Sequence, residues 1–147
     1  MSKHISSELR RTVAKRANFV CEYCLIAEED SYFRHQIEHI ISLKHSGVSE
    51  SENLAFSCVH CNRNKGSDIA SISASTKKIV RFFNPRTDRW QNHFRLDGVI
   101  IKSISDIAEV TISILQMNSD DRIAERLILQ RTSRYPSDAA LLLITDH

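Results

Sequence analysis

The chain of 147 residues contains 41% hydrophobic and 26% charged residues, which suits one compact domain, or one domain with a long appendage. Its longest apolar run, AALLLI at residues 139–144, is far shorter than the roughly 18 apolar residues of a membrane-spanning helix. The N-terminal MSKHISSELRR lacks the apolar core of a secretion signal. We therefore expect a cytoplasmic protein without a membrane segment.

The formal net charge is only +2, but the charges are unevenly distributed. Residues 1–18 contain five basic side chains against Glu8 alone, and residues 71–95 contain six against Asp88 alone. These segments flank a more acidic middle, which is compatible with a polyanion held from two sides. Ordinary solvated helix faces explain the charges equally well.

The first half of the chain alternates short elements with polar connections. Residues 6–19 space apolar side chains at helical intervals after Ser6 or Ser7, either of which can cap a helix. A polar connection leads to residues 35–43 (HQIEHIISL), which read as a short strand, and residues 44–53 form a loop. Residues 54–58 lead into a short helix that we expect to end near Gly66.

The second half of the chain differs from the first in composition. Residues 82–94 contain the only Trp and three Phe, and we expect Trp90, Phe82 and Phe94 to be core residues. Residues 97–105 indicate a turn and a strand. Two helices are expected next, one from a cap at Asp106 through Met117 and one from a cap at Asp120 through Leu129, with Ile123 and Leu127 inward.

We divide the chain into a domain at residues 1–76, which contains the N-terminal helix and both cysteine pairs, and an extension at residues 77–147. The composition changes after residue 76, and no internal repeat or low-complexity segment is present. The extension is expected to pack on the same unit.

Four cysteines form two C-x-x-C pairs, CEYC with Cys21 and Cys24 and CVHC with Cys58 and Cys61. Each short turn aims two thiolates at one point, and Zn²⁺ takes four such ligands, so the spacing predicts a structural zinc site. A redox dithiol or a disulfide framework is the alternative, disfavoured by the lack of a secretion signal. A site closed by four thiolates has no open position, so any chemistry has to lie between the pairs.

The segment between and just after the cysteine pairs carries residues suited to phosphodiester hydrolysis. Histidine titrates near neutrality, so we predict that His39 is the general base that takes a proton from water. Glu38 and Asn62 carry oxygens that hard cations accept, and we predict that they hold a catalytic Mg²⁺ or Mn²⁺ ion. Asn53 would fix the loop or the tautomer of the imidazole by hydrogen bonding.

Adjacent residues of a regular strand point to opposite faces, so Glu38 and His39 can share a site only where the strand ends or is distorted. Phosphate contacts are expected from four further residues around this insert. They are Arg63, Lys65, Lys44 and His45.

The stretches EHII and NLAFSCVHCNRNKG, framed by CEYC, resemble the HNH endonuclease family over roughly residues 15–70. The resemblance implies an α+β fold with a ββα-metal core, a hairpin followed by a helix around one divalent ion, braced by the four-cysteine zinc site and followed by an α/β C-terminal extension. It places the three motif positions on His39, Asn53 and Asn62, and the acidic position before the first on Glu38.

The resemblance implies an enzyme that hydrolyses DNA and leaves a 5′-phosphate and a 3′-hydroxyl. A non-catalytic, zinc-stabilised nucleic-acid-binding module is the rival, but it would not need Glu38, His39 and Asn62 together. An RNA-directed nuclease is a third reading, because attack by water does not involve the 2′-hydroxyl. Bacterial defence and repair are both compatible settings, and no protein partner is indicated.

Overall fold

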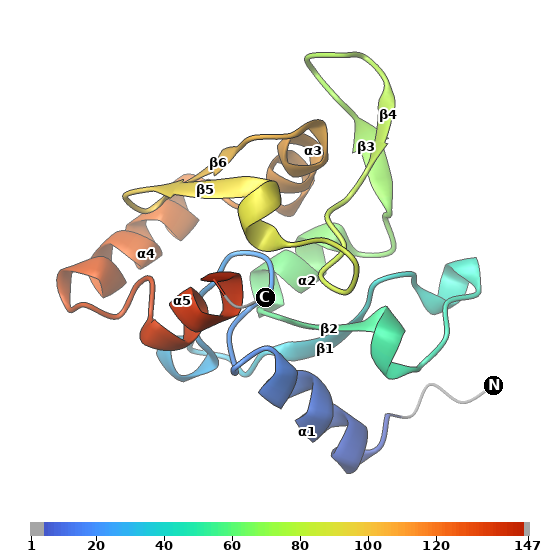
Figure 1. Cartoon of the computed structure of the whole chain (residues 1–147), viewed down its shortest axis with the longest axis horizontal. Helices are drawn as coiled ribbons and strands as arrows, with labels where there is room; N and C mark the ends of the chain where they lie inside the picture. Colours follow the sequence, from blue (N-terminus) through green and yellow to red (C-terminus); the bar gives the residue numbers. More distant parts are fainter. Residues whose placement is uncertain (1–4, 146–147) are drawn as a thin grey trace.

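The computed structural model describes residues 5–145, and in this range it is a mixed α/β fold with three two-stranded antiparallel sheets and five α-helices (Figure 1). No helix in that range is long and apolar enough to cross a membrane. The helices and strands are α1 (Ser7–Arg16), β1 (Gln36–His39), β2 (Leu54–Ser57), α2 (Val59–Lys65), β3 (Ala70–Ile72), β4 (Ile79–Arg81), β5 (Phe94–Asp97), β6 (Ile100–Ser103), α3 (Asp106–Leu115), α4 (Asp120–Arg131) and α5 (Asp138–Thr145).

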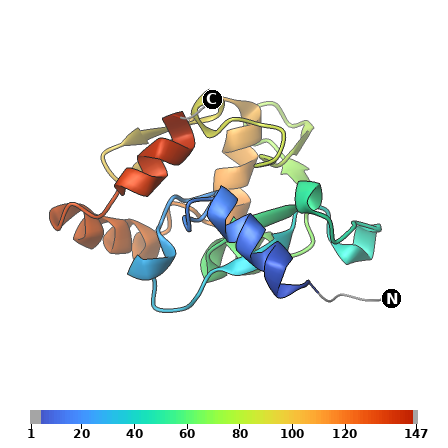
Figure 2. The same ribbon diagram turned by 60° about the horizontal axis from the view of Figure 1, so that its bottom comes forward.

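Helix α1 confirms the predicted N-terminal helix and packs on one face of the β1–β2 sheet (Figure 2). The hydroxyl of Ser6 accepts a hydrogen bond from the Leu9 N–H at 3.1 Å and so caps the first turn. The buried Val13 of α1 joins Leu54 and Phe56 of β2 in a small hydrophobic cluster. This cluster fixes the helix against the sheet.

The sheet β1–β2 and helix α2 form the ββα unit expected from the sequence. Strand β1 is shorter than the predicted strand at 35–43, because the chain turns away after His39, which pairs with Leu54. Cys58 caps α2, and its Sγ accepts from the Cys61 N–H. The helix ends at Gly66 as predicted, where the positive φ of 54° favours glycine.

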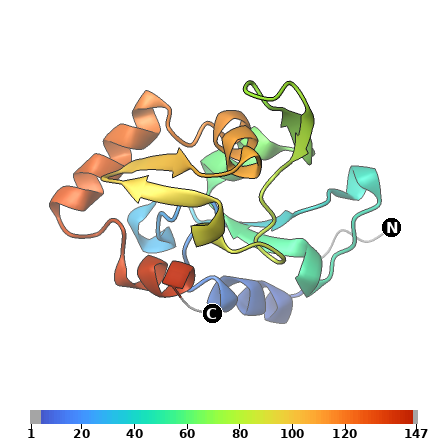
Figure 3. The same cartoon turned by 45° about the horizontal axis from the view of Figure 1, so that its top comes forward.

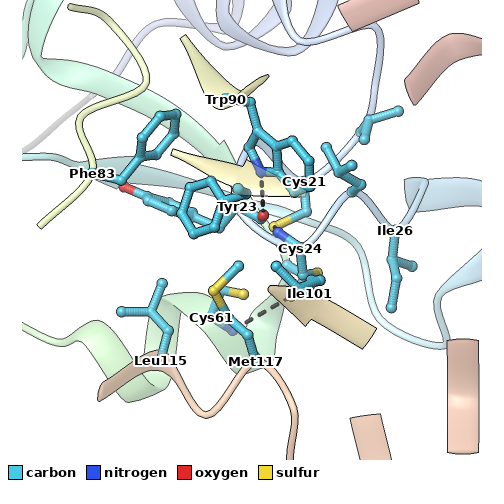
Figure 4. Close-up of a cluster of buried hydrophobic side chains, with 14 of the residues drawn as sticks. Cys21, Tyr23, Cys24, Ile26, Cys61, Phe83, Trp90, Ile101, Leu115 and Met117 are labelled. Carbon is cyan, nitrogen blue, oxygen red and sulfur yellow. Dashed lines mark hydrogen bonds between the residues drawn. The ribbon is translucent and has the colours of Figure 1, made fainter. Parts of the chain in front are cut away.

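The aromatic segment after β4 fills the space between the ββα unit and the rest of the chain. Trp90, Phe82 and Phe94 are buried, as predicted. The indole N–H of Trp90 donates to the Tyr23 carbonyl at 2.9 Å, and Figure 4 shows the ring beside Tyr23 and the cysteines. One hydrophobic cluster thus contains residues from both proposed segments, from Val20 to Ala140.

The β3–β4 hairpin, which the sequence did not indicate, crosses the proposed boundary at residue 76, and the domain division stays a prediction. Its strands have only three residues each, too few for a clear periodicity. The Glu109 carboxylate of α3 accepts from the Ser73 hydroxyl and the Ala74 N–H, both at 2.9 Å. This contact fixes the hairpin turn to α3.

Two predicted helix caps were wrong by one residue. Ser105 caps α3, where its hydroxyl accepts from the Ala108 N–H, and Ser119 precedes α4; Asp106 and Asp120 are the first helical residues. Carboxylates in a first turn are favourable, so the same sequence signal fits either position. Helix α5 was not predicted.

The inward face of α4 also differs from the prediction. Leu127 is 37% exposed, and the buried side chains of the helix are Arg122 and Arg126. Arg126 is fully buried and donates to the carbonyls of Val99 and Met117, and so ties α4 to the β5–β6 turn (Figure 3). Ile123 packs against the hydrophobic core as predicted, and hydrogen bonds to backbone carbonyls add to the apolar contacts of the helix.

Replacement of Arg126 tests this arrangement. The substitution Arg126→Met should lower the free energy of unfolding by about 3 to 5 kcal/mol, because it leaves the buried carbonyls of Val99 and Met117 without donors. Urea denaturation measures the loss. The exposed Arg131→Met on the same helix is the matched control and should change the value by less than about 0.5 kcal/mol; equal losses would contradict the structural role.

Candidate metal centre and active-site cleft

The four cysteines meet in one buried cluster. Their sulfur atoms all lie within 4.8 Å of one another, and Cys24 Sγ is 3.7 Å from Cys58 Sγ. A tetrahedral zinc ion with zinc–sulfur bonds of about 2.3 Å requires sulfur–sulfur separations of about 3.8 Å. The thiols are free, without a disulfide. The cluster therefore fits a four-thiolate metal site.

Backbone and side-chain donors surround these sulfurs. The N–H groups of Cys24 and Cys61 point to Cys21 Sγ at 3.5 Å and to Cys58 Sγ at 3.4 Å. Such hydrogen bonds spread the negative charge of thiolates. The two C-x-x-C turns are thus folded alike, each with a donor aimed at its first sulfur.

Arg122 is a residue of this centre that the sequence did not reveal. Its guanidinium donates to Cys24 Sγ at 3.0 Å and to Cys58 Sγ at 3.4 Å. Burial opposes its charge, but the neighbouring cysteine sulfurs raise the pKa of Arg122 above its ordinary value. Four thiolates around a divalent cation carry an excess of two negative charges, and Arg122 offsets one of them.

The second candidate site is a cleft of about 330 Å³ at the end of β1. His39 and Asn62 both line it, together with Lys44 and the turn at Gly66. The structure therefore brings together two of the three predicted catalytic residues. The Nε2 atom of His39 lies 2.9 Å from the Ser49 hydroxyl.

The surroundings of His39 favour the neutral imidazole that a general base requires. Partial burial, and next the ammonium group of Lys65, lower the pKa of His39 from its ordinary value. This direction favours the neutral ring, which has a lone pair that can accept a proton.

Asn53 fixes the loop that lines one side of the cleft, one of the two roles considered for it. Its amide N–H groups donate to the carbonyls of Ile41 at 2.9 Å and Val48 at 2.8 Å, and its oxygen accepts from the Ile41 N–H. A Cβ atom at Gly47 would lie 1.7 Å from the Ile41 carbonyl oxygen, so only glycine fits there. The loop carries Ser49, and Ser49 rather than Asn53 contacts the imidazole.

Glu38 and Lys65 form a buried ion pair behind the cleft. The Lys65 Nζ lies 2.7 Å from Glu38 Oε2, and both side chains are less than 4% exposed. Lys65 also donates to the Ile40 carbonyl at 2.9 Å, and the Tyr23 hydroxyl donates to Glu38 Oε1 at 2.8 Å. Burial raises the pKa of Glu38, although Lys65 opposes that change.

This pairing bears on two sequence predictions. Lys65 is buried and bound to Glu38, so it does not present its charge to a phosphate, which corrects the expected contact. Glu38 and Asn62 line the same cleft and have the oxygen donors that a hard cation takes, but the Glu38 carboxylate already carries a cation, the Lys65 ammonium. A divalent ion can bind Glu38 only where Lys65 gives up this contact.

The other predicted phosphate contacts lie at the surface. Lys44 is exposed at the cleft rim, and His45 is exposed in the same turn. Arg63 is exposed on α2, with its guanidinium 3.3 Å from His60 Nδ1. All three side chains are accessible.

Part of the second basic segment serves the fold instead. Arg86 forms an ion pair with the buried Glu22 and donates to the Leu54 carbonyl, and Arg81 pairs with Asp88 at 2.7 Å. Burial raises the pKa of Glu22, with Arg86 acting in the opposite direction. The basic residues of this segment are therefore not all available to a polyanion.

A comparison with protein families identifies the segment that contains both sites. Residues 21–68 match the model of the HNH endonuclease family. No curated protein and no solved structure matches the chain. The matched segment runs from Cys21 past Gly66 and includes His39, Asn53 and Asn62, so the resemblance seen in the sequence is confirmed.

Removal of Lys65 tests the buried ion pair. Lys65→Met should lower the free energy of unfolding by about 3 to 5 kcal/mol at pH 7, because it leaves the Glu38 carboxylate buried without its cation. The double variant Glu38→Gln with Lys65→Met removes both charges and should recover much of this loss. Urea denaturation of the two single variants, Glu38→Gln and Lys65→Met, and of the double variant gives the coupling; losses of the single variants that simply add in the double variant would contradict the pairing.

Proposed function

Residues 21–68 are an HNH endonuclease domain, and from this premise we propose that the protein is a metal-dependent endonuclease that hydrolyses phosphodiester bonds in DNA. The observation that carries the proposal is the cleft at the end of β1, which is lined by both His39 and Asn62. A module that only binds nucleic acid has no use for a base in such a position.

His39 is the proposed general base. We assign Nε2 as its basic nitrogen, because the Ser49 hydroxyl 2.9 Å away can donate to it and leave the ring proton on Nδ1. A water molecule in the place of that hydroxyl would lose its proton to Nε2 as it attacks phosphorus. The loop held by Asn53 sets the position of Ser49 and so marks where the water binds.

A divalent ion, Mg²⁺ or Mn²⁺, is proposed at Asn62, with Glu38 as a second ligand once Lys65 gives up its contact with the Glu38 carboxylate. When bound, such an ion offsets the negative charge that develops on the phosphate and on the leaving oxygen. Lys44 at the rim and Arg63 on α2 are proposed to hold the neighbouring phosphates. The expected products are a 5′-phosphate and a 3′-hydroxyl.

Zinc is the metal proposed for the cysteine cluster. The purified protein should contain about one zinc ion per chain, and Cys61→Ser should lose it and become markedly less stable, because structural zinc contributes directly to folding. Metal analysis and thermal unfolding give the two readouts. His60→Ala, which changes the neighbouring residue of CVHC outside the cluster, should keep the zinc; zinc retained by Cys61→Ser would contradict the site.

The test of the nuclease proposal is a cleavage assay on plasmid, linear and single-stranded DNA and on RNA, with Mg²⁺, Mn²⁺ or a chelator. His39→Ala should reduce the cleavage rate by about 10² to 10⁴-fold, because it removes the base, while zinc content and thermal unfolding stay as in the wild type. His60→Ala is the control outside the cleft. Cleavage of none of these substrates by the wild-type protein would favour the binding module, and RNA as the preferred substrate would favour the RNA nuclease.

A further inference from the structure

A second hollow of about 470 Å³ lies between α1 and β1. Its walls come from the exposed side of α1, from the segment that leads into β1, and from Ile37 and Phe56 of the sheet. Three arginines line it, Arg10 and Arg11 from α1 and Arg34 from the segment before β1. We refer to this hollow as the arginine groove.

The charge of the arginine groove is not neutralised within the fold. All three arginines are exposed, and within residues 5–145 their guanidinium groups form no ion pair. Glu28 is the one acidic residue among the lining residues, and one of its carboxylate oxygens accepts from the His35 N–H at 2.9 Å. Three free cations against one engaged carboxylate favour an anionic ligand.

His35 adds an unsatisfied polar group to the groove. It is only 7% exposed, its Nε2 lies 2.9 Å from the Ile26 carbonyl, and its Nδ1 has no hydrogen-bond partner among the described residues. Because Nε2 faces a carbonyl, a neutral ring carries its proton there and Nδ1 is an acceptor, which needs a donor group and not a phosphate oxygen as its partner. Phe19, which is 47% exposed, adds an aromatic ring to the same wall, on which a nucleobase could stack.

The arginine groove continues from the catalytic cleft along one face of the strand. Ile37 lines both hollows. Successive side chains of a strand point to opposite sides, so every second residue lies on the same face. This face carries Ile37 and His39 of β1, and His35 directly before the strand. The four residue steps from His35 to His39 span about 13 Å, which corresponds to roughly four nucleotide steps of 3.4 Å along a duplex.

We propose that the arginine groove binds the phosphate backbone of the nucleic acid substrate on one side of the scissile bond, about four nucleotides from it. Arg10, Arg11 and Arg34 hold the phosphates, and β1 is the track that joins this contact to the cleft. The arginine groove proposal depends on the proposed nuclease function in one respect, the position of the scissile phosphate in the cleft. Binding in the groove itself does not require cleavage.

The test measures binding with the full chain in the His39→Ala background, so that the probe is not cut. Fluorescence anisotropy follows a labelled 30-base-pair DNA duplex, its single strand and the matching RNA over a series of salt concentrations. The triple substitution Arg10→Ala, Arg11→Ala and Arg34→Ala should weaken binding about tenfold or more and reduce the salt slope by roughly 2 to 3, near 0.9 per lost phosphate contact on a duplex.

Two matched variants separate the groove from general charge. Arg95→Ala, Lys102→Ala and Arg131→Ala together remove three exposed cations from β5, β6 and α4, and should weaken binding less than about twofold. The triple substitution Arg10→Lys, Arg11→Lys and Arg34→Lys keeps the charge and should retain most of the affinity. Circular dichroism and zinc content check that each variant is folded.

The outcomes distinguish this proposal from the nuclease proposal. Equal weakening by the two triple alanine variants, or no binding of any probe, would overturn the arginine groove. If the groove variant alone loses binding while the wild type cuts no substrate, the groove stands and the nuclease proposal falls. If the wild type cuts DNA and the groove variant binds and cuts as well as the wild type, the groove is wrong and the nuclease proposal stands.

Discussion

The buried pair of Glu38 and Lys65 connects the parts of the molecule that have to keep a fixed relation. Glu38 belongs to β1, Lys65 to the end of α2, and the Tyr23 hydroxyl reaches the pair from inside the first cysteine turn. Lys65 also holds the Ile40 carbonyl, where the chain leaves the strand. Two buried charges are costly unless both are matched, so other arrangements of strand, helix and cysteine turn are disfavoured.

The cysteine cluster and the C-terminal segment support this pair from the other side. The cluster joins the first cysteine turn to the start of α2, and the C-terminal segment closes over it with Arg122 on the sulfurs and the Tyr135 hydroxyl on the Cys24 carbonyl at 2.8 Å. The indole N–H of Trp90 likewise donates a hydrogen bond to the Tyr23 carbonyl of the first cysteine turn. The segment beyond residues 21–68 therefore completes the environment of the cysteine cluster.

The sequence predicted the features that depend on local spacing: the two C-x-x-C turns, the N-terminal helix, the end of α2 and the family resemblance around His39 and Asn62. It did not predict partners that meet across the chain. Arg122 lies 98 residues from Cys24, and a basic residue on a helix reads as exposed until the fold places it. The ion pair of Glu38 was hidden for the same reason, because a carboxylate beside a candidate base reads first as a metal ligand.

Glu38 and His39 point to opposite faces of β1, so the environment of each side chain depends on the register of β1 with β2. A shift of one residue in β1 would move the imidazole of His39 toward Lys65 and put a carboxylate in the place of the proposed base. Such a shift would break the buried ion pair and remove the proposed base from the cleft at the same time. An insertion or deletion of one residue in β1 or β2 would therefore disrupt both features. The close approach of Gly47 to the Ile41 carbonyl makes the loop between the strands intolerant of such changes as well.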